Sequence, residues 1–143
     1  MYGMVKTPNP PRSRCSINFG LEIFGDKWTL LILRDMLMVG KKTFKEFQAS
    51  DERIASNILS ERLVRLEQSG LIQQQAVKAD ARQIHYVPTD ACRALLPILV
   101  EMAYWGATHD PKTGAPKSFV RGYERDRDRL LMALARGTDP AKS

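Results

Sequence analysis

Residues 56–70 read SNILSERLVRLEQSG, and this stretch decides the fold of the chain. At 100° per residue, Leu59, Leu63 and Leu66 share one narrow face, which predicts an amphipathic helix over about Asn57–Gln68. The opposite face carries mostly polar side chains: Asn57, Ser60, Glu61, Val64, Arg65 and Gln68, with Arg62 on the flank. Such a helix packs through its leucines and leaves its polar face free for solvent or a partner.

Turn signals bound this helix on both sides. Ser56 is suited to cap its N-terminus, and Gly70 stands where a left-handed residue commonly ends a helix. Three further helices are predicted before it, separated by Gly25-Asp26 and by Gly40. They begin near Ser16 (with Ile17, Leu21 and Phe24 on one side) and span about Lys27–Leu37 and Thr43–Gln48, the last with Phe44 and Phe47 turned inward.

A hairpin and a long helix are predicted to follow. Leu71–Val77 and Gln83–Val87 read as two short strands, because Ile84 and Tyr86 alternate with polar neighbours in the second run. Thr89 opens a helix to about Thr108, with a kink or break expected at Pro97 because proline lacks an N–H donor.

This element order predicts a mainly α protein with a small β-hairpin wing (α+β), that is, a winged helix-turn-helix with extra helices at both ends. The predicted division is a flexible basic arm over residues 1–14, the winged domain over 15–110, a linker over 111–117, and a C-terminal helix (about Ser118–Arg136) and tail over 118–143.

Composition is that of an ordinary folded domain, with 43% apolar and 27% charged residues among 143. The most apolar run is too short for a membrane span and the N-terminus has no signal-peptide core, so a cytoplasmic location is expected. The net charge of +6 resides in the two terminal segments. Most basic residues of residues 15–110 nevertheless gather between Lys41 and Arg82, among a smaller number of acids.

The polar face of the helix after Ser56 is suited to enter the major groove of double-stranded DNA, because its side chains can bond base edges and phosphates. Asn57 can bond adenine through two hydrogen bonds, and Arg62 and Arg65 can reach guanine or phosphate. The full predicted DNA-binding set is Asn57, Ser60, Glu61, Arg62, Arg65, Lys41, Lys42, Lys45, Lys78 and Arg82, the last two at the hairpin tip. A solvated surface helix explains the polar face alone equally well, and the charged hairpin tip is what favours DNA.

Several ordered motifs cover about two-thirds of the chain. They are FGDKWTLLILRD at 24–35, FKEF at 44–47, IASNILSERL at 54–63, LEQSGL at 66–71, LLP at 95–97 and WG at 105–106. With these motifs the segment Cys15–Asp110 resembles the HxlR family of winged-helix regulators, relatives of the MarR group.

The resemblance implies a homodimer on a pseudo-palindromic operator, with Asn57–Gln68 as recognition helix and the helices at Ser16 and Thr89 in the dimer interface. It is also the basis for expecting a transcription regulator, with repression favoured over activation. The sequence departs from the family at Ala79-Asp80-Ala81, where the wing lacks prolines, and at Cys92, where a glycine is common. The C-terminal helix exceeds the family minimum, and it is either an extension of the dimer interface or a solvent-exposed tail.

Cys15 is the candidate redox sensor. It precedes a predicted helix start and neighbours Arg12 and Arg14, and a helix N-terminus and cations both favour the reactive thiolate. The resemblance implies that a cysteine here can sense oxidants or electrophiles, and a small-molecule or oxidant effector is therefore expected. A small packing cysteine is the alternative reading for Cys15. Cys92 is interpreted as a packing residue.

Other chemistry finds no support in the sequence. His85 and His109 lack neighbours at metal-ligand spacing, and no catalytic triad or phosphate loop occurs, so no enzyme activity, metal or cofactor is predicted. Trp28 and Trp105 are interpreted as core or interface residues. The remaining alternative is a winged-helix module for protein–protein assembly that does not bind DNA.

Overall fold

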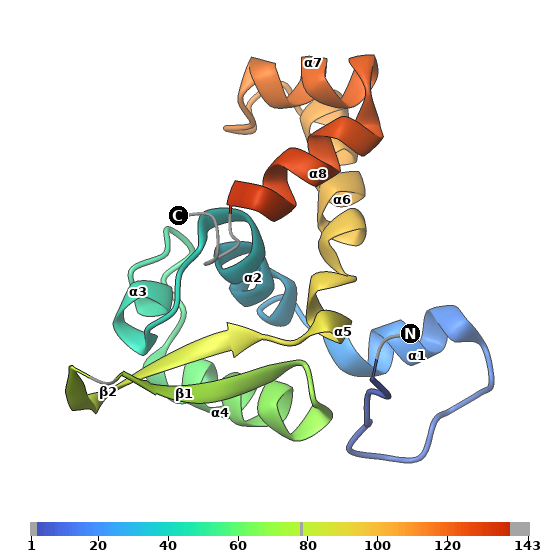
Figure 1. Cartoon of the computed structure of the whole chain (residues 1–143). Coiled ribbons are helices and arrows are strands. Elements are labelled where there is room, and N and C mark those ends of the chain that lie inside the picture. Colours follow the sequence, from blue (N-terminus) through green and yellow to red (C-terminus); the bar gives the residue numbers. More distant parts are fainter. Residues whose placement is uncertain (1–2, 78, 138–143) are drawn as a thin grey trace.

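The computed structural model describes residues 3–77 and 79–137 and is mostly helical with one antiparallel hairpin (Figure 1). Before the hairpin the elements are α1 (Ser16–Phe24), α2 (Thr29–Arg34), η1 (a π-helical turn, Asp35–Val39), α3 (Phe44–Gln48) and α4 (Ser56–Ser69). After them come β1 (Ile72–Val77), β2 (Asp80–Pro88), α5 (Asp90–Arg93), α6 (Leu96–His109), α7 (Lys117–Arg125) and α8 (Arg127–Gly137). The predicted fold class, mainly α with a hairpin wing, is confirmed.

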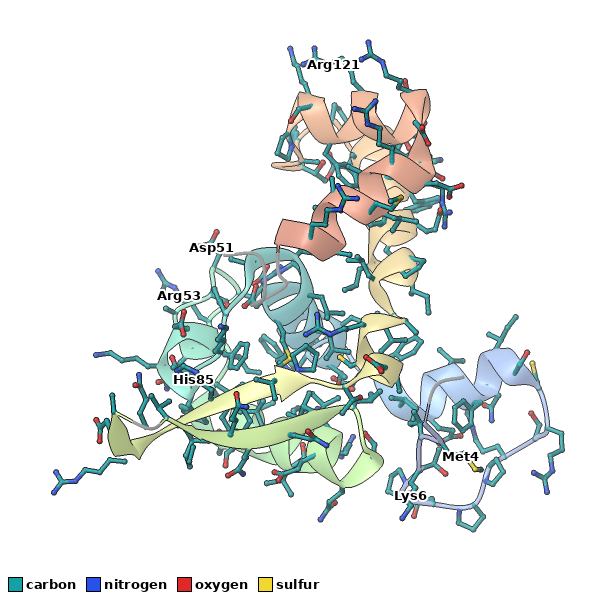
Figure 2. The ribbon with its side chains drawn as sticks, in the orientation of Figure 1. Met4, Lys6, Asp51, Arg53, His85 and Arg121 are labelled. Atoms are coloured by element: carbon teal, nitrogen blue, oxygen red, sulfur yellow. The ribbon has the colours of Figure 1, made fainter. Side chains whose placement is uncertain are left out.

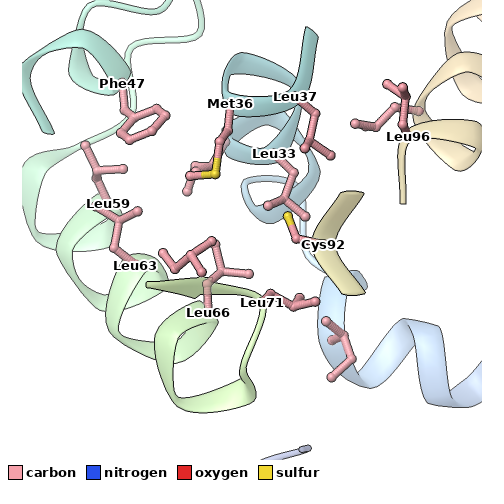
Figure 3. Packing of buried hydrophobic residues seen from close by; sticks show 14 of the residues in the cluster. Leu33, Met36, Leu37, Phe47, Leu59, Leu63, Leu66, Leu71, Cys92 and Leu96 are labelled. Carbon is pink, nitrogen blue, oxygen red and sulfur yellow. The ribbon is translucent and has the colours of Figure 1, made fainter. Parts of the chain in front are cut away.

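The core lies between α2, α3, α4 and the start of the hairpin (Figure 3). Leu59, Leu63 and Leu66 are at most 2% exposed, as their helical period predicts. Phe47 of α3 and Leu33 of α2 pack into the same cluster. Burying one leucine side chain is worth about 1.5–3 kcal/mol, so this apolar face fixes the rotation of α4 about its own axis.

Local capping explains where α3 begins and where α4 ends. Thr43 and Glu46 form a capping box: the Thr43 hydroxyl accepts from the Glu46 N–H, and the Glu46 carboxylate accepts from the Thr43 N–H. Gly70 has φ of 88° and ends α4 in the left-handed region, as predicted. The predicted N-cap Ser56 is instead the first helical residue, and the cap position belongs to Ala55, which makes no side-chain capping bond.

The hairpin differs from prediction at its tip. β2 begins at Asp80, three residues earlier than expected, and the register shifts between Ala76 and Val77. Tyr86 packs beside Phe47 in an edge-to-face contact and joins the core as expected. Ile84 lies farther out and is 42% exposed, because the hairpin extends beyond the core there.

Both predicted C-terminal helices are interrupted. The first breaks between Arg93 and Leu96, with Pro97 in the first turn of α6, where its missing N–H costs nothing. The helix predicted over Ser118–Arg136 is two helices, because Asp126 takes an extended conformation (φ −163°, ψ 93°) and reverses the chain.

The reversal at Asp126 folds α8 back so that it contacts both α6 and η1. The rings of Tyr104 and Tyr123 stack with centroids 3.8 Å apart, and the Tyr123 hydroxyl donates to Glu101 over 2.7 Å. These contacts join α7 to the far end of α6, so the C-terminal segment is a packed helical hairpin. Figure 1 shows α7 at the end of α6 remote from the β-hairpin, and α8 running back from there toward α2.

Candidate nucleic-acid interface

The outer face of α4 is the centre of the candidate site. Because the leucine face is buried, the opposite side chains are held outward: Asn57, Ser60, Glu61, Val64 and Gln68 are exposed and Arg65 is half-buried. These six side chains line an open hollow of about 650 Å³ together with Pro8 and Asn9 of the N-terminal segment. The structure therefore brings together the polar residues that the helical period assigned to one face.

The two arginines of α4 have carboxylate partners. Arg65 donates from Nη2 to Glu61 Oε1 over 2.6 Å, one helical turn away. Arg62 donates from Nε to Asp26 Oδ1 over 3.2 Å and also contacts Glu61, and its side chain is 19% exposed. Arg62 thus ties the flank of α4 to the turn before α2, a contact that its position in the sequence did not reveal.

Asp26 organises that turn. Its Oδ1 accepts from the N–H groups of Trp28 and Thr29 over 2.8 and 2.9 Å, and its Oδ2 accepts from the Thr29 hydroxyl over 2.6 Å. Partial burial opposes ionisation of Asp26, but the hydrogen bonds from Thr29, Trp28 and Arg62 outweigh it and lower its pKa to about 2.

The three predicted lysines differ in their surroundings. Lys41 donates from Nζ to Ser50 over 2.9 Å and pairs with the buried Asp35 over 3.3 Å. Lys42 is half-buried, and its carbonyl accepts from the Tyr86 N–H over 2.7 Å, which fastens β2 to the loop before α3. Lys45 is exposed on α3, and among the described residues no carboxylate lies within ion-pair distance of its ammonium.

The network around Lys41 also holds the turn between α3 and α4. Arg34 pairs with both Asp35 and Glu52, at 2.9 and 2.8 Å. The hydrogen bonds from Arg34 lower the pKa of Glu52 to about 2. Ser50, at the end of α3, also donates to Asp35. This charged cluster fixes the turn before α4, so Lys41 serves the fold directly.

Sequence analysis missed Arg53, in the turn between α3 and α4. It has φ of 55°, an uncommon conformation for a residue with a side chain, and its guanidinium is exposed. Figure 2 shows Arg53 beside Asp51 at the outside of this turn. The available signal was its position just before α4, although its backbone conformation was not predictable.

The hairpin tip carries the last two residues of the predicted DNA-binding set, Lys78 and Arg82. Arg82 is exposed, and its N–H donates to the Asp80 carboxylate over 3.0 Å. Lys78 lies outside the described residues. Gln74 of β1 donates to Glu67 of α4 over 3.0 Å, so the wing and α4 are directly joined.

The two thiols lie in opposite environments. Cys15 is exposed at the start of α1, and the N–H groups of Asn18 and Ile17 lower its pKa. Arg12 is directed elsewhere, toward Glu22 and Asn18 at 2.9 and 2.6 Å. Cys92 is buried in the core, where burial raises its pKa to about 12, in agreement with its predicted packing role.

An apolar cavity of about 450 Å³ separates α1 from the α5–α6 segment. Its lining includes Ile17, Leu21 and Phe24 of α1 together with Leu95 and Ile98. Ile17 and Leu21 are 74% and 50% exposed, so the apolar side predicted for α1 is largely uncovered in the single chain. Trp105 on α6 is also 65% exposed, which favours an interface role for it over a core role.

Two kinds of structural feature are absent from the described residues. No helix there is long and apolar enough to cross a membrane. No group of three or more His, Cys, Asp or Glu side chains is arranged to hold a metal ion within residues 3–77 and 79–137.

Comparison with known proteins places this geometry in a family. Residues 23–113 match the HxlR-like helix-turn-helix family. YybR of Bacillus subtilis strain 168, an uncharacterized HTH-type transcriptional regulator, is 29% identical over 100 residues, covering 70% of this chain and 79% of YybR. YdeP of the same organism, also an uncharacterized HTH-type transcriptional regulator, is 33% identical over 92 residues, covering 64% of this chain and 71% of YdeP.

A solved structure agrees with these sequence matches. The redox regulator HypR in its oxidized form superposes with a TM-score of 0.57 at 29% identity, covering 66% of this chain and 96% of HypR. The predicted winged helix-turn-helix is therefore confirmed as the fold. The chain belongs to the HxlR-like helix-turn-helix family and is a transcription regulator of that type.

Proposed function

We propose that the chain is a sequence-specific repressor that binds a pseudo-palindromic operator as a homodimer. The observation that carries the proposal is the outer face of α4, which holds Asn57, Ser60 and Gln68 outward beside the wing. Amide and hydroxyl groups on an outward helix face are able to read base edges in the major groove. Asn57 and Ser60 then specify bases, and Arg65 and Glu61 act as a pair on the same face.

Phosphate contacts come from the exposed basic residues around α4. Lys45 on α3, Arg53 in the turn and Arg82 on the wing present exposed cationic side chains on three different elements. Lys42 and Arg62 contribute phosphate contacts from half-buried positions. Lys78, a hairpin-tip residue of the set predicted from the sequence, is proposed to contact phosphate as well. Phosphate contacts set register and orientation on the duplex, whereas base contacts set specificity.

The homodimer is proposed to form through α1 and α6. Ile17, Leu21, Trp105 and Met102 are between 50% and 74% exposed on these two helices, more apolar surface than single scattered residues would explain. A second copy of the chain covers this surface in the proposal. Light scattering after gel filtration tests it: wild type should have the mass of a dimer, and Ile17→Asp should shift it toward a monomer of 16.2 kDa.

Effector sensing is proposed for Cys15, an exposed thiol whose pKa is lowered at the start of α1. The redox regulator HypR has a similar fold, which supports an oxidant or electrophile as the signal. Because Cys15 immediately precedes the proposed dimer helix, its modification would alter how two subunits meet. Cys15→Ser should keep operator binding under an oxidant that releases the wild type, and identical behaviour of both proteins would reject sensing.

DNA binding is tested by selecting duplexes from a randomised pool and measuring their affinity by gel shift at several salt concentrations. Wild type should select one inverted repeat and bind it less tightly as salt rises. Asn57→Ala should cost about 1–3 kcal/mol of binding free energy and relax the preference at one base position. Failure to bind any duplex would instead support the assembly-module alternative. Repression is tested by a reporter gene placed behind the selected sequence.

A further inference from the structure

The N-terminal strap, residues 3–14, has defined contacts with the winged domain. The Lys6 N–H donates to the Ser69 carbonyl at the end of α4 over 3.1 Å, and Val5 packs against the core. The Thr7 hydroxyl donates to the Asn9 carbonyl over 2.9 Å and shapes the next turn of the strap. The contacts of Lys6 and Val5 hold the strap against the winged domain.

The strap lies at the end of α4 that is remote from the hairpin tip. Pro8 and Asn9 form one wall of the 650 Å³ hollow whose other wall is the outer face of α4. Figure 1 shows the hairpin tip at one end of α4 and the N-terminal segment beyond its other end. A duplex seated on the outer face of α4 would therefore meet the wing on one side and the strap on the other.

The chemistry of the strap suits a polyanion. It contains three basic residues and no acidic residue. The Lys6 side chain is exposed, and no carboxylate of the described residues lies within 4 Å of its ammonium. Asn9 adds an exposed amide donor, whereas Arg12 is occupied by Glu22.

The proline content of the strap lowers the cost of binding. Pro8, Pro10 and Pro11 each fix one backbone angle, so less conformational entropy remains to be lost when the strap meets a ligand. The backbone bond from Lys6 to Ser69 already holds the strap at the end of α4.

We propose that the strap is a second DNA-contacting element, in which Lys6 and Asn9 bind phosphates at the end of α4 remote from the hairpin tip. This proposal rests on the proposed function. Val5 of the strap also borders the apolar cavity beside α1, so the strap is continuous with the proposed dimer face. In a dimer formed through α1 and α6, the DNA phosphates that the two straps contact lie in the centre of the operator, between its two half-sites.

The test measures affinity for the duplex selected by the full-length wild type, by fluorescence anisotropy between 50 and 200 mM salt. The variants are Lys6→Gln and Asn9→Ala, and the matched charge control is Arg121→Gln. Figure 2 shows Arg121 at the opposite end of the molecule from Lys6. Lys6 keeps its backbone bond to Ser69 in the variant, so the fold is preserved, and circular dichroism checks this.

One lost phosphate contact lowers the slope of log affinity against log salt by about 0.9, so Lys6→Gln should lower it by about 2 in a dimer. Asn9→Ala should weaken binding without changing the slope, because the amide carries no charge. Arg121→Gln should leave affinity and slope unchanged. Replacing the central phosphates of the duplex by neutral methylphosphonates should lower the affinity of the wild type more than it lowers the affinity of the Lys6→Gln protein.

Two results would overturn the proposal while leaving DNA binding intact. One is a Lys6→Gln protein with the wild-type slope and the wild-type sensitivity to methylphosphonates. The other is tighter binding by Lys6→Gln and Asn9→Ala, which would mean that the strap covers α4 and opposes the duplex. A wild type that binds no selected duplex would overturn the proposed function itself, a distinct outcome.

Discussion

Replacing Asp26 by alanine should destabilise the protein more than replacing its partner Arg62. The Asp26 carboxylate accepts four hydrogen bonds: two from backbone N–H groups, one from the Thr29 hydroxyl and one from Arg62. Arg62→Gln removes only the last of these. The comparison therefore separates the bonds that hold the turn before α2 from the bond that ties this turn to α4.

The magnitudes follow from burial. Thr29 is 1% exposed, so without Asp26 its N–H and hydroxyl would be left without their partner away from water, at about 1–3 kcal/mol per orphaned group. With two such groups on Thr29, Asp26→Ala should cost about 2–6 kcal/mol of unfolding free energy. The Arg62–Asp26 pair is partly solvated, so Arg62→Gln should cost about 0.2–1 kcal/mol.

Urea denaturation followed by circular dichroism measures both values at pH 7. An Asp26→Ala protein within about 0.5 kcal/mol of wild type, or no less stable than Arg62→Gln, would refute the reasoning. A pH series adds a second check with Asp26→Asn. The pKa of Asp26 is depressed to about 2 in the folded protein, so its ionised form stabilises the fold above the ordinary pKa of 3.8. That contribution is lost as pH falls toward 2, and the gap between wild type and Asp26→Asn should close over this range.

Three further predictions concern a thiol, a turn and a lysine. Cys15 should react with iodoacetamide at neutral pH well before Cys92, because its pKa is lowered and that of Cys92 is raised by burial; mass spectrometry of the alkylated protein checks this, and equal rates would contradict it. Gly70→Ala should cost about 1–2 kcal/mol of unfolding free energy, since φ is 88° there, whereas Gly114→Ala, with open space around its added methyl group, should be near neutral in the same urea titration. Lys45→Gln should lower DNA affinity and its salt dependence while leaving the urea midpoint unchanged, and an unchanged salt slope would show that Lys45 makes no phosphate contact.

The parts of the fold that sequence predicted best are those set by local period and by proline. Leu59, Leu63 and Leu66 repeat at helical spacing, and burial of that face requires no information from elsewhere in the chain. Pro97 interrupts a helix because proline has no N–H to donate, and the break between Arg93 and Leu96 lies just before it.

The features that sequence did not predict depend on tertiary partners. The sequence does not reveal that Lys41 lies beside Asp35 and Ser50, because these residues come from different elements, and the phosphate contact of Lys41 stays a prediction. The reversal at Asp126 was missed because residues on both sides of it continue a helical pattern, and the packing of α8 on α6 decides the turn. The contact of the strap with α4 rests on a backbone hydrogen bond to Ser69, which no side-chain pattern encodes.

The return of α8 to η1 has a mechanical consequence for the winged domain. α6 leaves that domain after the short break between Arg93 and Leu96, and its Leu96, Leu99 and Val100 are buried in the core. α8 contacts both α6 and η1, so it links α6 to the winged domain at a second place. Tilting α6 away from the winged domain would therefore break the contacts of α8 with η1 as well as those of α6 with α2, and a chain cut after His109 would hold its proposed dimer helix less rigidly.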